Sequence, residues 1–402
     1  MAKARCLLVI NSGSSSLKFT VFSIPDLDSL LGGLAERLGT PAASFSIRYA
    51  DGRKKQQTIS GADHHVALRA VLETLKEAQL DDVGAVGHRI VHGGEKFRRP
   101  QLVDPEVKSQ IREVFELAPL HNPAGLHGIE IVEELLPGMP QVVVFDTAFH
   151  QTWLPEVYRY AIPEEYYKRW RIRRYGFHGI SNQYVTKEVS NRLGRPVDQL
   201  HLVLCHLGNG CSATAVREGQ SVDNTMGLTP LEGLMMGTRS GNVDPNLHLV
   251  LSEKEGLSLP EIIQLLTTRS GLLGVSGVSH DLREVIKAAD EGNTSAQLAI
   301  NLFSHRLAKG VLELTAGLAR VDAIAFSGGI GEHSAQIRSL TVDRLAIVHA
   351  QLDPRRNEQH GKETNGLISP DNSLPIFVIA TNEELLIAQE TLKLTSSSVD
   401  PT

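Results

Sequence analysis

The chain has 402 residues and a formal net charge of −6, with 41% hydrophobic and 21% charged residues. Its length favours two domains, and its acidic balance gives no overall field that would attract nucleic acid or an anionic membrane. The longest apolar runs, such as residues 6–10 and 142–145, are strand-length and too short to span a bilayer. Because the net charge of the chain is negative, an anionic substrate must be held by local positive groups.

The N-terminus and the cysteines favour a cytoplasmic protein. Residues 1–5 contain two cations but lead into only about six apolar residues before Asn11, fewer than a secretory signal needs. The three cysteines, Cys6, Cys205 and Cys211, are an odd number without paired spacing. This pattern is typical of buried thiols in a reducing compartment rather than of disulfides or a zinc site.

A strand–turn–strand pattern occurs twice along the chain. Each copy has an apolar strand, a turn of small polar or glycine residues, a second strand and, further on, another apolar strand that ends in a turn. The repetition predicts a duplicated α/β architecture with two lobes. The segments are 5–10, 11–16, 17–22 and 141–145 in the first copy and 201–205, 206–210, 212–216 and 323–326 in the second.

Helices are predicted where apolar residues recur at helical spacing. They cover residues 67–78, 260–266 and 295–318, and the capping signal Thr381-Asn-Glu-Glu384 begins a last helix that continues through Leu392 before a frayed tail at 396–402. The third of these helices is predicted to place five apolar residues on one side, namely Leu298, Leu302, Leu307, Val311 and Leu314.

The two turns are candidates for phosphate binding. The sequence has no Walker loop and no Gly-x-Gly-x-x-Gly that opens a helix after a strand. The turns at 11–16 and 206–212 instead gather backbone N–H groups and hydroxyls, and Lys18 adds a cation beside the first. A Gly/Ser cluster is more often a plain tight turn, so the interpretation depends on its occurring twice. The glycines of 327–333 add a weaker signal of the same kind.

Two arginines lie in glycine-containing loops, Arg89 in the segment 87–94 and Arg239 in Gly237-Thr-Arg-Ser-Gly241. A guanidinium in such a loop suits carboxylate and phosphate oxygens, although an ion pair that ties the loop to its lobe is an equal alternative. His121 and His178 lie in turns where a ring can face a cleft. No metal-binding spacing of His and Cys supports a transition metal.

Eight segments, in order along the chain, carry a resemblance to a known family. They are 11–18, 87–94, 117–123, 145–150, 174–179, 206–210, 226–241 and 380–385. Together they resemble the acetate kinase family of short-chain acid kinases over nearly the whole chain. That family belongs to the superfamily of sugar kinases, actin and the seventy-kilodalton chaperones.

The resemblance implies an α/β, duplicated, two-lobed actin-like ATPase fold. Ribonuclease H-like sheets with flanking helices would form the lobes, with the active site in the inter-lobe cleft. The N-terminal lobe would cover residues 1–150 and be joined by the C-terminal helix 383–402, and the C-terminal, nucleotide-binding lobe would cover 151–382. A homodimer is also implied.

The resemblance further implies a role for individual residues. Asn11 and Glu383 would lie at the Mg²⁺ site, with Lys18 near the phosphates. Arg89, Asp146, His178 and Arg239 would be the catalytic residues, and Arg89 would also bind the substrate acid. The acid's methyl group would contact Val91, Leu120, Phe177 and Pro230. The nucleotide would contact His206, Leu207, Gly208, Asn209, Gly210, Asp281, Leu282, Arg283, Gly329, Ile330, Gly331, Glu332 and His333.

The sequence departs from the family's usual pattern in three places. His333 stands in place of Asn, Asn242 in place of Asp, and Ile180-Ser-Asn182 in place of Thr-Ser-His. None of these changes removes a charged group assigned to the chemistry. They bear on nucleotide preference and turnover rate rather than on the reaction.

The implied reaction is reversible, Mg-dependent transfer of the ATP γ-phosphoryl group to acetate, which gives acetyl phosphate and ADP. A carboxylate is ionised at neutral pH, so its in-line attack needs relief of charge repulsion rather than a base, and Arg89, Arg239 and the turn amides supply it. Asp146 is predicted to orient Arg89 or a metal-bound water, although an aspartate acts as base in related sugar kinases. The alternatives are a propionate or butyrate kinase, or a non-catalytic nucleotide switch of the actin or chaperone type.

Overall fold

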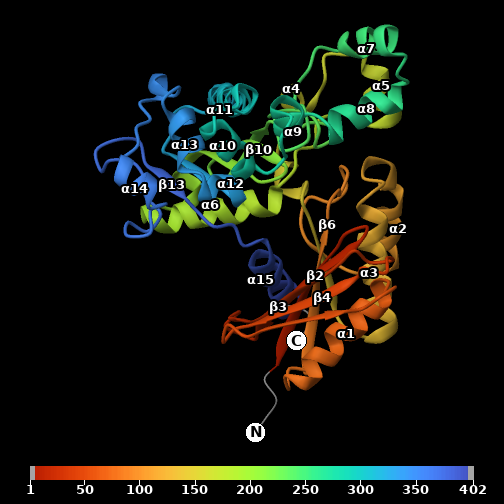
Figure 1. Cartoon of the computed structure of the whole chain (residues 1–402). Coiled ribbons are helices and arrows are strands. Elements are labelled where there is room, and N and C mark those ends of the chain that lie inside the picture. The colour runs from red at the N-terminus through yellow and green to blue at the C-terminus, as the bar shows by residue number, and fades with distance from the viewer. Residues whose placement is uncertain (1–4, 397–402) are drawn as a thin grey trace. The chain divides into compact units, whose positions relative to one another are not determined.

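The computed structural model describes residues 5–396, which divide into two compact units (Figure 1). Unit 1 comprises the described parts of Met1–Phe149 and Asn382–Thr402, and unit 2 comprises His150–Thr381. The last helix runs over Glu383–Ser396, and the remainder of the predicted helix and tail, 397–402, lies outside the described residues. Within residues 5–396, no helix combines the length and apolar character needed to cross a bilayer.

Unit 1 contains an eight-stranded sheet with the order β5-β4-β3-β2-β1-β6-β8-β7. The predicted first hairpin is confirmed, since β1 and β2 pair antiparallel with Asn11 opposite Lys18, while β1, β6 and β8 run parallel. The strands are β1 (Cys6–Ser12), β2 (Ser16–Ser23), β3 (Ser29–Glu36), β4 (Ser44–Tyr49), β5 (Lys54–Thr58), β6 (Val83–Ile90), β7 (Gln101–Leu102) and β8 (Gln141–Phe145).

Helices cover both faces of the central strands in unit 1. Val86 of β6 belongs to the core shared with α1, whereas its neighbour Gly87 points to the other face, as alternate residues of a strand do. A side chain at Gly87 would place its Cβ 2.5 Å from the Thr391 hydroxyl and 2.8 Å from Ile387 of α15, so glycine lets α15 pack closely. The helices are α1 (His64–Glu77), α2 (Pro105–Glu113), α3 (Asn122–Leu135) and α15 (Glu383–Ser396), with 3₁₀ turns at Phe115–Leu117 and Ala148–His150.

Unit 2 repeats the topology of unit 1. Its sheet has the order β11-β10-β9-β12-β13, with antiparallel β11/β10/β9 and parallel β9/β12/β13, which matches β3-β2-β1-β6-β8. The predicted duplication is therefore confirmed. The strands are β9 (His201–Leu207), β10 (Cys211–Arg217), β11 (Gln220–Asn224), β12 (Ala323–Ser327) and β13 (Ile376–Val378).

The pairing changes one detail of the predicted repeat. By position, β12 corresponds to β6 and β13 to β8, whereas the sequence pattern set the strand 323–326 beside 141–145 as the equivalent segment. Both are fully buried strands that end in a turn, so the pattern alone does not distinguish them. Only the ladder partners identify equivalent strands.

The predicted helices are present with shifted ends. The first begins at His64, because Asp63 accepts a hydrogen bond from the Val66 N–H, and the third ends at Leu314 in a 3₁₀ turn. Leu298 was predicted to share one side of α11 with four other apolar residues but is 58% exposed, whereas Leu307, Val311 and Leu314 of that set are buried. The helices of unit 2 are α4 (Pro155–Tyr158), α5 (Glu164–Trp170), α6 (Gly179–Leu193), α7 (Leu247–Glu255), α8 (Leu259–Thr268), α9 (Gly271–Ser276), α10 (Leu282–Asp290), α11 (Thr294–Leu314), α12 (Gly328–His333), α13 (Ala335–Val342) and α14 (Pro354–Glu358), with 3₁₀ turns at Val197–Gln199, Thr315–Gly317 and Ala346–Val348.

Candidate active site

Three predicted site residues of unit 1 meet at one edge of its sheet. Asn11, Arg89 and Asp146 lie at or just after the carboxyl ends of β1, β6 and β8, and adjacent parallel strands bring such ends together. The Arg89 guanidinium forms a two-point ion pair with Asp146, with Nε donating to Oδ1 at 3.1 Å and Nη2 to Oδ2. Nη1 also donates to Asn11 Oδ1 at 3.5 Å.

The helix α15 adds two carboxylates to this edge. Glu383, in the first turn of α15, lies 3.6 Å from Arg89 Nε, and Glu384 forms an ion pair with Lys18. Burial alone would lower the pKa of Arg89, but Asp146 and Glu383 outweigh it and raise that pKa. The predicted polar residues of unit 1 thus lie together at this edge, and the charge of Arg89 is already balanced by carboxylates.

The oxygens around Arg89 have the chemistry that Mg²⁺ prefers. Asn11 and Glu383 contribute an amide and a carboxylate oxygen, both hard ligands. Among the described residues, no group of three or more His, Cys, Asp or Glu side chains could hold a metal ion by itself. The residues therefore fit Mg²⁺, which is commonly bound through one or two protein oxygens, water and a nucleotide's phosphates.

Several residues that the sequence did not single out hold the unit 1 loops. The Asn122 side chain exchanges two hydrogen bonds with the backbone of His92, at 3.0 and 2.8 Å, and Thr147 Oγ1 accepts from the Gly93 N–H at 3.0 Å. His64 Nε2 donates to the Gly13 carbonyl at 2.7 Å, which fixes the tip of the first hairpin. None of these side chains was assigned a role from the sequence, although Asn122 and Thr147 lie in two of the segments that carry the family resemblance.

In unit 2, Arg239 and His178 converge beside Gly210. A side chain at Gly210 would place its Cβ 3.2 Å from Arg239 Nη1 and 3.4 Å from His178 Nε2. His178 is oriented by a hydrogen bond between its Nδ1 and Ser212 Oγ, 3.0 Å apart. A guanidinium and an imidazole therefore point at one position that is open because residue 210 has no side chain.

Arg239 differs from Arg89 in having no carboxylate partner among the residues that the structure describes. Its Nη1 donates to the Pro230 carbonyl at 3.3 Å and approaches Met236 Sδ at 3.7 Å, and no ion pair of Arg239 occurs among residues 5–396. Burial lowers the pKa of Arg239, opposed only by the thiol of Cys211. A half-buried cation without a counter-charge binds an anion more favourably than a cation that is already paired with a carboxylate, as Arg89 is.

A close pair of histidine rings, tilted by 32° to one another, extends this cluster. The rings of His178 and His206 lie 4.2 Å apart, and His206 Nδ1 is 2.8 Å from Ser181 Oγ. Ser181 in turn hydrogen-bonds Thr381 Oγ1 at 2.7 Å. The predicted residue His206 is thus held in place through hydroxyls that the sequence did not identify as functional.

Most of the predicted nucleotide-binding residues line one cavity of 480 Å³ in unit 2, within the usual size range of cofactor sites. The structure adds His280, Ile286 and Ser334 to its lining. The predicted residues His206, Leu207, Gly210, Gly331 and Glu332 are not part of it. Predicted residues that line it are Gly208, Asn209, Asp281, Leu282, Arg283, Gly329, Ile330 and His333.

Two acidic residues of the predicted nucleotide set have their carboxylates engaged elsewhere. Asp281 caps α10 and pairs with Arg283, whose hydrogen bonds lower the pKa of Asp281 to about 2. Glu332 Oε1 accepts hydrogen bonds from the Gly328 N–H at 3.0 Å and the Thr381 N–H at 3.3 Å. Both carboxylates therefore hold backbone segments near the cavity in place by accepting hydrogen bonds from their N–H groups.

The four residues predicted to contact the acid's methyl group fall in both units. Val91 and Leu120 belong to unit 1, where Leu120 is 73% exposed. Phe177 and Pro230 belong to unit 2, where the Phe177 side chain is only 2% exposed and lies in the core. Pro230 is directly linked to the cluster, since its carbonyl accepts from Arg239.

The chain is similar to known proteins in both sequence and structure. The sequence matches the profile of the acetokinase family over residues 6–389. It is 46% identical over 394 residues to an acetate kinase from Desulfitobacterium hafniense, covering 96% of this chain and 98% of that protein. Among solved structures it is similar to an acetate kinase from Porphyromonas gingivalis (TM-score 0.91, 40% identity, 97% and 100% coverage) and a propionate kinase from Francisella tularensis (0.90, 40%, 96% and 98%). With the sheet topology, these likenesses confirm the predicted duplicated fold of the actin-like ATPase type.

Proposed function

Because the chain belongs to the acetokinase family, we propose that it is an acetate kinase that transfers the γ-phosphoryl group of ATP reversibly to acetate, giving acetyl phosphate and ADP. The observation that carries this proposal is Arg239, a half-buried cation that has no carboxylate partner in the described part of the chain and points with His178 at the open position beside Gly210. Such a pair suits the oxygens of a phosphoryl group in transfer.

The residues of each unit have distinct proposed tasks. In unit 2, the 480 Å³ cavity holds the nucleotide, and Arg239 and His178 donate hydrogen bonds to the transferring group. In unit 1, Arg89 binds the acid's carboxylate, and Asp146 orients the guanidinium through its two-point ion pair. The carboxylate is the nucleophile and is already ionised, so no side chain needs to remove a proton.

A magnesium ion completes this proposal. Asn11 and Glu383 would hold Mg²⁺, which supplies positive charge to the phosphate oxygens of the nucleotide. Lys18 would act from the first hairpin, where it pairs with Glu384. The exchange of Glu384 for a phosphate oxygen as the partner of Lys18 would accompany nucleotide binding.

The proposed activity is tested by acyl-phosphate formation from ATP and Mg²⁺, trapped with hydroxylamine, with acetate, propionate and butyrate in parallel. We expect acetate to give the highest kcat/KM. One methylene changes binding in an apolar pocket by about 1–3 kcal/mol, or 10–200-fold, so the assay separates the acids clearly. Propionate-led activity would assign the chain to the alternative suggested by the similar propionate kinase. ATP binding without any acyl phosphate would exclude both.

We also propose a cytoplasmic homodimer. The three cysteines are free and buried, which fits a reducing compartment. Two neighbouring helices of unit 2, α7 and α8, expose apolar side chains that a second copy would cover. These are Leu249 at 57%, Val250 at 42%, Leu259 at 62% and Ile263 at 41% exposure.

The dimer is checked by the molar mass in solution from light scattering coupled to gel filtration. We expect the unmodified chain to elute as a dimer and the double variant Leu249→Asp/Leu259→Asp as a folded monomer, because each new carboxylate would have to be desolvated in the contact. A dimer that survives both changes would place the interface elsewhere, and a monomeric parent chain would refute the proposal.

A further inference from the structure

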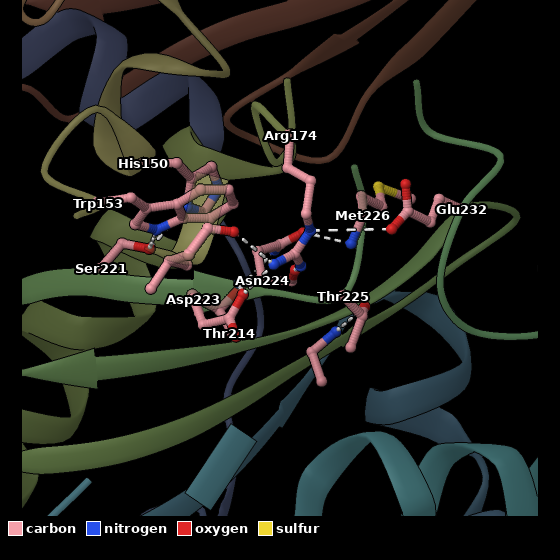
Figure 2. Close-up of polar contacts among 12 residues, drawn as sticks. His150, Trp153, Arg174, Thr214, Ser221, Asp223, Asn224, Thr225, Met226 and Glu232 are labelled. Atoms are coloured by element: carbon pink, nitrogen blue, oxygen red, sulfur yellow. Dashed lines mark hydrogen bonds and ion pairs between the residues drawn. The ribbon is translucent and has the colours of Figure 1, made fainter. Parts of the chain in front are cut away.

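We propose that Arg174 is a positioning residue that fixes the segment carrying His178 relative to the loop carrying Arg239. Figure 2 shows its guanidinium between Asp223, Asn224 and Glu232. Nη1 donates to the Val157 carbonyl at 3.0 Å and pairs with Asp223 Oδ1 at 3.0 Å, and Nη2 donates to the Asn224 carbonyl. This role rests on the proposed function, because it acts through two residues assigned to phosphoryl transfer.

On one side, Arg174 belongs to the segment that leads to His178. The Tyr175 N–H donates to the Gly227 carbonyl at 3.0 Å, and the Phe177 carbonyl accepts from His150 Nε2 at 2.9 Å and from Asn224 Nδ2 at 3.3 Å. The segment is therefore held at both ends by the strand end and loop that Arg174 contacts.

The part of this network around His150, on the left of Figure 2, is also fully oriented. Because His150 Nε2 donates to Phe177, its Nδ1 must accept, and Ser221 Oγ donates to it at 2.7 Å. Ser221 Oγ in turn accepts from Trp153 Nε1 at 3.0 Å. Burial lowers the pKa of His150 to about 4, so the ring stays neutral and this pattern persists at physiological pH.

On the other side, Arg174 contacts the loop that carries Arg239. Glu232 Oε1 lies 3.8 Å from Arg174 Nε, and the Tyr160 hydroxyl donates to the Glu232 carboxylate. Directly after Glu232, the loop is closed by two hydrogen bonds between Gly233 and Asn242, at 2.7 and 3.0 Å.

The geometry connects this closure to the reaction. Pro230 and Arg239 lie on either side of Glu232 in the chain, and Arg239 Nη1 donates to the Pro230 carbonyl. A shift of Glu232 therefore moves the wall proposed for the acid's methyl group and the guanidinium proposed for the phosphoryl group. The nucleotide cavity is built from other segments, on α10, α12 and the turn after β9. Loss of Arg174 should thus affect the acid and the chemical step rather than ATP binding.

The test compares Arg174→Gln with a matched control, Arg192→Gln. Both arginine side chains are 18% exposed, and Arg192 likewise donates to two backbone carbonyls, those of Asn365 and Val378, at 2.9 and 3.1 Å. We expect Arg174→Gln to lower kcat/KM for acetate by about 10²-fold while KM for ATP stays within about twofold, since a misplacement of about 1 Å costs a rate factor of that order. Arg174→Lys should recover part of the loss, and Arg192→Gln should change neither parameter.

Two further measurements keep the proposal falsifiable. Amide hydrogen exchange should become faster in residues 225–241 of Arg174→Gln but not of Arg192→Gln, a result that does not depend on activity. In a double-mutant cycle, Glu232→Gln should add little to Arg174→Gln, and Glu232→Gln alone reports on the contact if Arg174→Gln does not fold. Equal losses for ATP and acetate, unchanged exchange, or additive effects would overturn the role of Arg174. A parent chain that forms no acyl phosphate would instead refute the proposed function.

Discussion

Replacement of Arg239 by glutamine is expected to lower kcat for acyl-phosphate formation by about 10²–10³-fold. The guanidinium has no carboxylate partner among the described residues and faces the open position beside Gly210 together with His178, so its charge is available to the transferring group. Glutamine keeps a donor but loses the charge and the planar fork. Steady-state kinetics in both directions, with ATP and acetate and with ADP and acetyl phosphate, would measure the loss.

The stability of the same variant separates catalysis from folding. Since Arg239 makes, among residues 5–396, only a 3.3 Å hydrogen bond to Pro230 and a 3.7 Å contact with Met236 Sδ, its removal leaves no buried charge there uncompensated. The melting temperature should therefore change by only a few degrees, as for Arg192→Gln. A variant with nearly full activity, or one that loses activity only because it unfolds, would contradict the role assigned to Arg239.

Replacement of Arg89 by glutamine, unlike that of Arg239, should strongly lower the stability of the fold as well as the activity. It leaves Asp146, whose side chain is only 3% exposed, without its two-point partner. Breaking a buried pair on one side typically costs about 3–5 kcal/mol, so the free energy of unfolding should fall by that amount in urea titrations, together with a loss of activity greater than tenfold. Arg89 is therefore predicted to be needed for folding stability as well as for acid binding.

The double variant Arg89→Gln/Asp146→Asn distinguishes these contributions. Neutralising both partners removes the unpaired charge, so stability should recover in large part while activity stays low. In Asp146→Asn alone, the pH profile of kcat should be unchanged if Asp146 only orients Arg89. The loss of an acidic limb from that profile would show instead that Asp146 acts as a base.

Local patterns predicted six of the strands, β1, β2, β8, β9, β10 and β12, and the turns beside them, because each is encoded by adjacent residues, whereas β3, β4 and β5 were not predicted. The hairpin tip at 11–16 and the turn at 206–210 follow apolar runs and contain small residues, which is sufficient to place them. The equivalence of β12 with β6 was not accessible, since the pairing of strands that are far apart along the chain, such as Cys6 with Val83 and Leu202 with Ala323, leaves no local mark. Leu298 was misplaced because helical spacing identifies a face without saying how wide its buried stripe is.

In the candidate site, too, the sequence identified individual residues but not their partners. Arg89 and Arg239 both stood out through their glycine-containing loops, but the sequence could not show that one is neutralised by Asp146 and Glu383 and the other is not. Arg173 and Arg174 are adjacent and indistinguishable by type. Only the structure shows that Arg173 lies over the Tyr158 ring while Arg174 joins Asp223 and Glu232. Such roles depend on partners about 50 residues away along the chain.

The packing of α15 has a consequence for how the protein is made. Unit 1 is assembled from the first and last parts of the chain, and Ile387 and Thr391 of α15 pack against the face of β6 at Gly87. Unit 2 is continuous, so during translation it can emerge and fold as soon as residue 381 has left the ribosome. The strands of unit 1 are synthesised earlier, and one of their apolar faces stays uncovered until α15 has been synthesised. At ordinary elongation rates this interval is on the order of tens of seconds. The half of the molecule that is synthesised first is therefore completed last, and it is the half for which chaperone protection matters most.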